Sequence, residues 1–306
     1  MVIDWVSSVN WDQQDRIKPL CNTLTLANGF PEHMRDTLVT KWLISAIAAA
    51  FKPTGFKSRG VLTLQGPQSI GKTSWLDSLV PDNKLRSELI KTGHLLDPSS
   101  KDSVLTALSH WLVELGELET TFNKSDIGKL KAFITESTDK VRRVYGYKDS
   151  EYPRRTVFFA SVNETNFLMD QTGNTRFWTI SVNTINYMHE IDMVQLWAQV
   201  YELYKTGSKW WLDNEQELQL EHLNQGHSVV SSMEELILTT FDFDSDERET
   251  RMSATEVAVQ CGYKQPTTKN SRDAGQSLRK LIGSPTQIKG KATWKMPPLT
   301  YTGQGF

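Results

Sequence analysis

The sequence is poor in cysteine and has no long apolar run, and these shortages exclude several classes of protein. Its two cysteines, Cys21 and Cys261, lie far apart, and its six histidines form no metal-ligand spacing. This pattern suggests a reducing cytosol rather than a disulfide framework or a zinc site. The most apolar stretch, residues 42–51, is too short to cross a bilayer, and the N-terminus has no signal-peptide pattern. We expect a cytoplasmic protein with no membrane partner.

Charge is unevenly distributed along the chain, although its formal net charge is only −2. Residues 251–306 contain nine Lys or Arg and only two Asp or Glu, so this part is basic while the remainder is acidic. An acidic run at residues 242–249 precedes it, which is typical of a solvated linker or a domain-edge loop. A basic module beside an acidic body predicts a polyanionic partner for that module.

The most informative motif occupies residues 66–73. It reads Gly66-Pro67-Gln68-Ser69-Ile70-Gly71-Lys72-Thr73, which matches the phosphate-binding P-loop G-x-x-x-x-G-K-[ST], and Ser74 follows it. The glycines allow a tight turn whose N–H groups converge on a phosphate chain. Lys72 would reach the β- and γ-phosphates, and Thr73 would offer its hydroxyl to Mg²⁺. A strand candidate precedes the motif and a helix candidate follows it, as a P-loop requires. We therefore expect this segment to bind ATP and Mg²⁺.

Hydrophobic periodicity predicts an α/β fold. Strand candidates at 60–65, 110–115, 156–162 and 177–182 alternate with helical stretches. Helical spacing at 12–20 and 33–51 indicates a helical region before them, and residues 183–241 are again helical in pattern. The expected domains are an N-terminal helical region for oligomerisation, the P-loop core, a helical extension and a basic C-terminal module, at residues 1–55, 56–185, 186–241 and 242–306.

Further polar residues complete an ATPase. Hydrolysis needs an acidic residue near a neighbouring strand end to hold Mg²⁺ and orient water; Glu114 and Glu117 are the candidates, and the sequence does not choose between them. Asn163 ends the strand candidate at 156–162 and could contact the γ-phosphate or the attacking water. Arg176 stands between a glycine turn and an aromatic strand and could stabilise transition-state charge from a neighbouring subunit; a surface salt bridge is the alternative for it.

A basic, aromatic stretch at residues 140–155 predicts a nucleic-acid contact. It contains six basic and two acidic residues. Two β-rich arms would form a hairpin with Lys148 near its tip, and basic groups interleaved with aromatics suit a DNA backbone and stacked bases. The candidate contacts are Arg142, Arg143, Tyr147 and Lys148. A solvated hairpin is the alternative.

The C-terminal module, residues 252–298, is typical of a winged helix. A capping box, Ser253 to Glu256, opens a helix that Gly262 ends. The second helix, residues 271–282, carries Arg272, Arg279 and Lys280 and suits a recognition helix in a major groove. The hairpin at 287–295 would be the wing, with Lys289 and Lys291 at its tip. A basic interaction domain without a DNA role is the alternative.

Together these pieces resemble the virulence-associated protein E family of phages and genomic islands, which is similar to superfamily 3 helicases of the AAA+ class. The stretches that carry the resemblance lie at residues 11–12, 66–73, 111–119, 130–135, 139–146, 161–164 and 173–178. The resemblance implies a Walker A at Gly66, Gly71, Lys72 and Thr73, a Walker B at Glu114 and Glu117, a sensor at Asn163, an arginine finger at Arg176 and a DNA-gripping hairpin with Lys148 at its tip.

The function implied by this resemblance is that of an ATP-dependent DNA helicase and replication initiator of a phage or phage satellite, acting in the bacterial host cytoplasm. We expect a homo-oligomer, a hexameric ring, with single-stranded DNA in its pore and duplex at the winged helix. No primase domain precedes the P-loop, so we expect a separate primase or host replication proteins. The alternatives are a DNA translocase that does not separate strands and a DNA-binding regulator switched by nucleotide.

Overall fold

The chain forms two compact units, Met1–Ser228 and Val229–Phe306. The computed structural model describes residues 1–116, 124–141, 150–163, 167–168, 174–227, 232–248, 250–288 and 290–300. Within them, no helix is long and apolar enough to cross a membrane.

The first unit is built around a six-stranded sheet in the order β1-β8-β2-β7-β4-β3. These strands are, in that order, Leu24–Leu26, Phe177–Ile185, Val61–Gln65, Val157–Val162, Leu112–Leu115 and Ile90–His94. Strands β8 to β3 are parallel, and β1 is antiparallel to β8. The result confirms the predicted α/β class and all four strand candidates, while β1 and β3 were not predicted.

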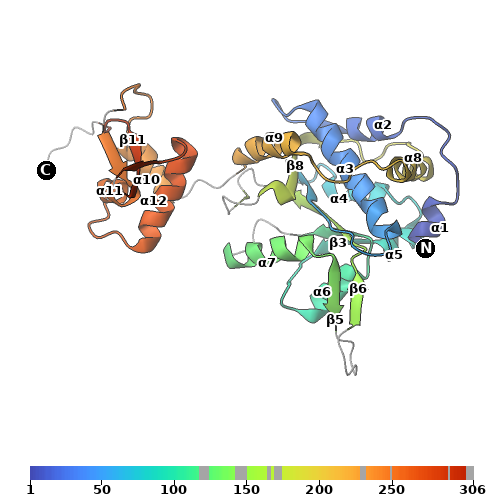
Figure 1. The fold of residues 1–306 in the computed structure, drawn as a ribbon. Helices are drawn as coiled ribbons and strands as arrows, with labels where there is room; N and C mark the ends of the chain where they lie inside the picture. The colour runs from blue at the N-terminus through green and yellow to red at the C-terminus, as the bar shows by residue number, and fades with distance from the viewer. Residues whose placement is uncertain are drawn as a thin grey trace. The chain divides into compact units, whose positions relative to one another are not determined.

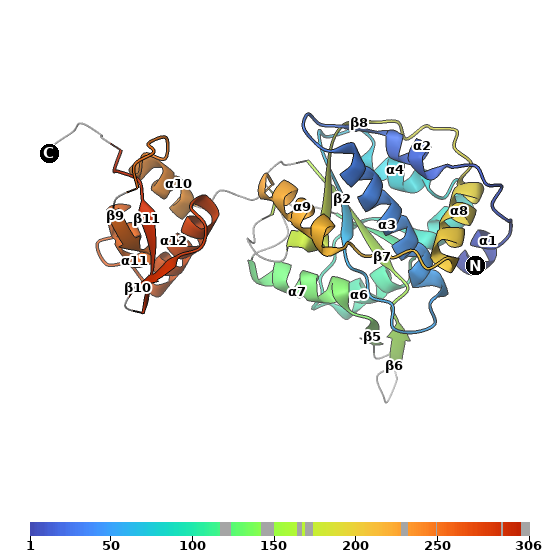
Figure 2. The same ribbon diagram turned by 45° about the horizontal axis from the view of Figure 1, so that its top comes forward.

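Helices cover both faces of this sheet (Figure 1 and Figure 2). Successive strand residues point to opposite faces: Leu62 and Phe159 belong to the larger apolar cluster, and Val61 and Phe158 to the smaller. The larger cluster includes residues of α1 (Val2–Val6), α2 (Ile17–Asn22), α3 (Glu32–Phe51), α4 (Lys72–Ser78), α5 (Asn83–Leu89), α8 (Met193–Lys205) and α9 (Asn214–Gln225). The smaller includes residues of α6 (Lys101–Leu108) and α7 (Lys124–Thr135).

The long helix α3 is part of this core rather than of a separate N-terminal region. It is rich in alanine, a strong helix former, and it ends where Pro53 disfavours helical backbone at Lys52. The indole of Trp42 donates to the carbonyl oxygen of Phe158 in β7 at 2.7 Å. Because α3 and β1 both pack into the sheet, the expected division at residue 55 is not a boundary between units.

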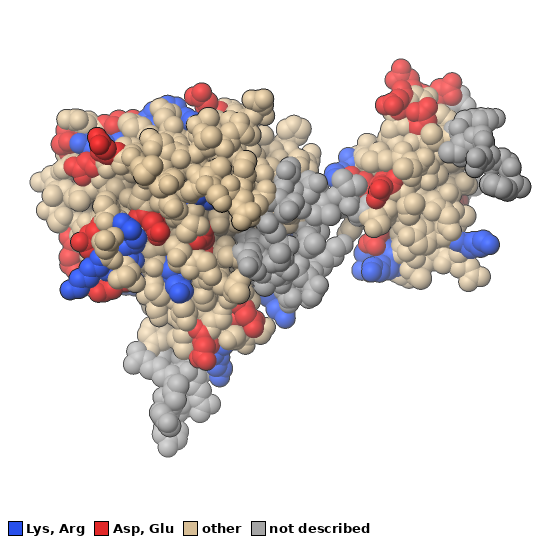
Figure 3. Space-filling view, turned by 180° about the vertical axis from the view of Figure 1, so that it is seen from behind, with Lys and Arg blue, Asp and Glu red and all other residues tan. Residues whose placement is uncertain are grey.

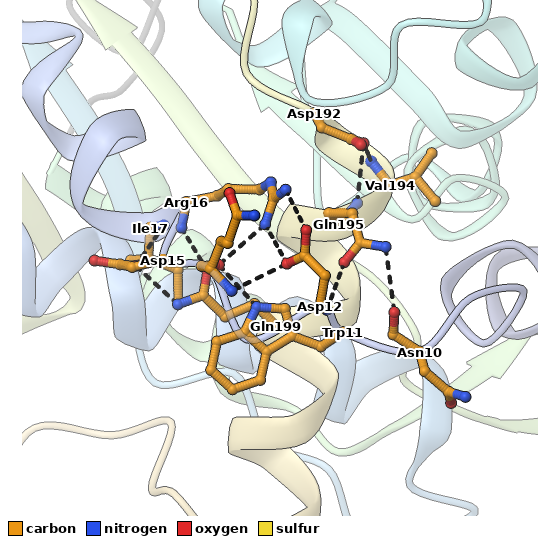
Figure 4. A network of polar contacts seen from close by, with 11 residues as sticks. Asn10, Trp11, Asp12, Asp15, Arg16, Ile17, Asp192, Val194, Gln195 and Gln199 are labelled. Carbon is orange, nitrogen blue, oxygen red and sulfur yellow. Dashed lines mark hydrogen bonds and ion pairs between the residues drawn. The ribbon is translucent and has the colours of Figure 1, made fainter.

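The segment before α2 is held against α8 by a network of polar contacts (Figure 4). Gln199 of α8, which is 7% exposed, accepts the N–H of Arg16 and donates to Asp15, both at 2.8 Å. Gln195 in the same way accepts the N–H of Asp12 and donates to the carbonyl oxygen of Asn10. Trp11 and Asp12, which contribute to the family resemblance, therefore lie in the segment that these contacts attach to α8. We call the contacts of Gln195 and Gln199 with this segment the clamp.

In its described residues, the second unit has three helices and a three-stranded antiparallel sheet in the order β10-β11-β9. Its elements are α10 (Ser232–Thr240), β9 (Thr250–Ser253), α11 (Ala254–Gln260), α12 (Thr268–Leu281), β10 (Thr286–Ile288) and β11 (Lys291–Met296). Met233 and Ile237 of α10 pack with Leu278 and Trp294 in its core. Because α10 belongs to this core, the unit begins before the expected boundary at residue 242, and the acidic run at 242–248 is a loop within it.

We expect Gln199→Met to lower the free energy of unfolding of the first unit by about 1–3 kcal/mol, because the partly buried N–H of Arg16 loses its acceptor. Urea unfolding followed by tryptophan fluorescence measures this, since every tryptophan except Trp294 lies in the first unit. Gln225→Met, at an exposed position of α9, is the matched control. Equal stability of the two variants would contradict the assigned role of the clamp.

Candidate functional site

The predicted phosphate-binding loop joins the carboxyl end of β2 to α4, in the middle of the parallel sheet. A Cβ atom at Gly66 would lie 2.2 Å from the carbonyl oxygen of Val182, so no larger residue fits there. Gly71 has φ +92°, in the left-handed region that favours glycine, and the ring of Tyr187 lies against it. Both glycines of the motif are therefore required by the backbone path of the loop.

The side chain of Lys72 points back into this loop and is 7% exposed. Its Nζ donates to the carbonyl oxygens of Gly66 and Pro67 and to Oδ1 of Asn163, each at 2.8 Å. Asn163 directly follows β7, the strand beside β2. The structure thus brings two of the predicted site residues, Lys72 and Asn163, into direct contact.

The carboxylate of Glu114 lies inside β4 and is 2% exposed. Its Oε1 accepts the hydroxyl of Thr73 at 2.6 Å and that of Ser161 at 2.7 Å. Its Oε2 accepts the N–H of Gly93 at 3.0 Å. The carboxylate therefore joins the start of α4 to β7 and to β3.

A second acid lies near this group on α4. Burial raises the pKa of Asp77, Arg86 opposes the rise, and the nearby charge of Glu114 adds to it. Within the described ranges, no group of three or more His, Cys, Asp or Glu residues is arranged so that it could hold a metal ion. Protein oxygens for a cation at this site come mainly from Thr73 and Glu114, which suits Mg²⁺, since Mg²⁺ usually takes few protein ligands together with phosphate oxygens and water.

The structure places Glu114, one of the two acidic candidates, beside Thr73. Glu117 lies outside the described residues. Ser161 and Gly93 could not be identified from the sequence as partners of Glu114, because strand pairing alone brings these residues together.

Arg176 lies at the opposite end of the sheet from the loop. It ends the short 3₁₀ helix η1 (Asn174–Arg176), and Phe177, which follows it, pairs with Val61 at the start of β2. The path along β2 to Gly66 is about 15–20 Å at 3.3 Å per residue, so Arg176 does not reach its own loop. The buried amide of Asn224 in α9 donates to the carbonyl oxygens of Asn174 and Phe177, both at 2.9 Å, and holds η1 in place.

The predicted basic hairpin has two antiparallel strands, β5 (Thr138–Val141) and β6 (Ser150–Pro153). Arg142, Arg143, Tyr147 and Lys148 lie outside the described residues. Two other basic residues of this stretch are structural. Arg154 is 1% exposed and lies over the ring of Phe133 at 4.4 Å, and Arg155 donates to the carbonyl oxygen of Ala50 at 2.8 Å.

The second unit contains the predicted helices and hairpin of the basic module as α11, α12 and β10–β11. The capping box is present, with the Ser253 side chain accepting the N–H of Glu256 and the Glu256 side chain accepting that of Ser253. Arg272 and Arg279 of α12 are exposed, as is Lys291 at the start of β11, while Lys289 lies outside the described residues.

Lys280 has a different environment from the other predicted DNA contacts. Its Nζ lies 2.6 Å from Oε1 of Glu234, a residue of α10 that is 2% exposed. This ion pair joins α12 to α10. On the face of this unit seen in Figure 3, a group of acidic side chains lies at one end, and Lys and Arg side chains lie at the opposite end.

Three comparisons show which known proteins this chain is similar to. A comparison with curated protein sequences finds no match. Among solved structures, the apo C-terminal region of NrS-1 (residues 305–718) is similar over 91% of this chain and 78% of that chain, with 14–15% identity and TM-scores of 0.39 and 0.38 in two structures. Another apo structure of that region gives 16% identity and a TM-score of 0.40, over 92% of this chain and 79% of that one.

The family model of the virulence-associated protein E-like domain matches residues 6–229. The match spans nearly all of the first unit, including the loop at 66–74, Glu114, Asn163 and Arg176. It confirms the resemblance drawn from the sequence motifs. The chain therefore belongs to the virulence-associated protein E-like family.

Proposed function

We propose that this protein is an ATPase that acts on DNA in the replication of a phage or mobile element, as a ring-forming helicase or replication initiator with a P-loop AAA+ core. The observation that carries the proposal is the convergence of Lys72, Thr73, Glu114 and Asn163 at the carboxyl ends of three neighbouring parallel strands. Open α/β sheets bind their ligands at this edge. The match to the virulence-associated protein E-like domain, which spans these four residues, supports the proposal.

Lys72 supports phosphate binding through its present partners. Two backbone carbonyls and an amide oxygen accept from its ammonium, and phosphate oxygens can replace these neutral acceptors with anionic ones. An anionic phosphate oxygen adds Coulomb attraction to the ammonium that a neutral carbonyl oxygen does not provide. Lys72 would then hold the β- and γ-phosphates, while Asn163, released from it, would orient the attacking water.

Thr73 and Glu114 are the residues that would hold Mg²⁺, which would supply charge neutralisation at the β- and γ-phosphate oxygens. The fit rests on the hydroxyl and carboxylate oxygens that already lie 2.6 Å apart. Ser161 and the N–H of Gly93 keep the Glu114 carboxylate oriented. Glu117, three residues further on, is then the candidate for polarising the water.

We expect Lys72→Ala and Glu114→Gln each to lower the ATP turnover rate at least a hundredfold, because each removes a charged group from the phosphates or Mg²⁺. A phosphate-release assay at saturating Mg²⁺ measures the rate. Lys84→Ala, an exposed lysine of α5, is the control and should leave the rate unchanged. An unchanged rate in Lys72→Ala would exclude ATP hydrolysis at this loop.

The position of Arg176 at the far end of the sheet supports a ring in which it completes the site of a neighbouring copy. We expect Lys72→Ala and Arg176→Ala to be inactive alone and to recover part of the activity when mixed, because some interfaces then pair an intact loop with an intact arginine. Arg59→Ala, an exposed arginine that shortly precedes β2, should stay active alone. If mixing restores nothing while both variants are folded, Arg176 does not act between subunits.

The second unit is proposed as a winged helix that binds duplex DNA through α12 and the β10–β11 hairpin. Arg272→Ala and Arg279→Ala should each weaken duplex binding and reduce the slope of log affinity against log salt by about one. Lys280→Met should leave that slope unchanged but lower the melting temperature, because the buried Glu234 loses its ammonium partner. Binding titrations at several salt concentrations measure the slopes. Equal slope changes for Arg279 and Lys280 would contradict the assignment.

An assay of the unwinding of forked DNA then distinguishes a helicase from a translocase that moves on DNA without separating its strands. A regulator switched by nucleotide would bind ATP and DNA with no turnover at all.

A further inference from the structure

The segment that follows β8 lies over the loop at 66–71 and is fixed at both ends. Asn186 donates its N–H to the carbonyl oxygen of Thr23 at 2.8 Å. The ring of His189 lies 3.1 Å from the hydroxyl of Ser78 on α4. Between these anchors, Tyr187 is 37% and Met188 77% exposed. An aromatic ring is thus held at the surface next to the loop.

Tyr187 is in close contact with Gly71. A Cβ atom at Gly71 would lie 2.2 Å from Cδ1 and 2.5 Å from Cε1 of the tyrosine ring. One edge of the ring therefore packs on the last glycine of the loop, directly before Lys72, while much of the residue remains accessible. A ring in this position needs its neighbour to be glycine, which adds a second reason for glycine at residue 71.

The order of strands sets the direction in which a nucleotide would extend from the loop. Lys72 bonds toward Asn163 after β7, and Glu114 lies one strand further, in β4. The terminal phosphates and Mg²⁺ therefore belong on this side of β2. The remainder of the nucleotide would leave the loop on the other side, where β8 and Tyr187 lie.

We propose that Tyr187 is the stacking platform for the base of the bound nucleotide. The inference rests on the proposed nucleotide site and adds to it the residue that recognises the base. Stacking on an aromatic ring tolerates any base, because each base has a π-face, so the platform contributes affinity for nucleoside triphosphates in general. Its contribution should be absent for a phosphate chain without a base.

The test compares ATP with inorganic tripolyphosphate in titration calorimetry with Mg²⁺. Tyr187→Ala should weaken ATP binding about tenfold, which lies within the effect of losing one base–aromatic stack. It should leave tripolyphosphate binding unchanged. Tyr187→Phe should bind ATP as the wild type does. Tyr152→Ala, with 36% exposure on β6, is the matched control in the absence of DNA. If Tyr187→Ala does not fold, Tyr187→Leu replaces it, since leucine keeps apolar contact with Gly71 but has no ring.

The competing location for the base is a pocket of about 430 Å³ beside Gly66 and Pro67, which includes Phe30 and Asn183. A loss of ATP affinity in Phe30→Ala but not in Tyr187→Ala would overturn the inference and leave the nucleotide site intact. Equal losses of ATP and tripolyphosphate affinity in Tyr187→Ala would also overturn it. If the wild type binds neither ATP nor tripolyphosphate, the proposed function and the inference about Tyr187 both fail.

Discussion

The buried carboxylate of Glu114 is the interaction on which the arrangement of the site depends. A buried carboxylate is costly unless hydrogen bonds compensate for lost water, and here two hydroxyls and one backbone N–H do so. These donors come from α4, β7 and the end of β3, so the same bonds fix the start of α4 against the sheet. Thr73 directly follows Lys72 at the start of α4, so the bond from Thr73 to Glu114 also holds the backbone of Lys72 in place.

The contacts of Lys72 with the loop at 66–71 and with Asn163 hold its ammonium in a position suited to binding an anion. The ammonium already points into the turn formed by Gly66 and Pro67, so little side-chain entropy remains to be lost when phosphate oxygens arrive. Arg176, by contrast, lies at the other end of the strands and is positioned by Asn224 of α9. The separation of these two groups within one subunit is the physical basis for expecting an assembly in which they meet across an interface.

Much of this could be predicted from the sequence, because the decisive signals are local. The P-loop spacing, the apolar runs of the four predicted strands and the Ser253–Glu256 capping box each depend on residues close in the chain. The partners of Glu114, the clamp of Gln199 and the contact of Tyr187 with Gly71 depend on strand order and helix packing, which periodicity does not encode. Lys280 shows the same limit: helical spacing placed it with Arg279, and only the packing of α10 revealed Glu234 as its partner.

The most direct measurement is an experimental structure of the protein with Mg²⁺ and a non-hydrolysable ATP analogue. The account predicts phosphate oxygens at hydrogen-bond distance, about 3 Å, from Nζ of Lys72, with Mg²⁺ held by Thr73 and Glu114. A nucleotide bound elsewhere, with Lys72 still on the carbonyl oxygens of Gly66 and Pro67, would contradict it.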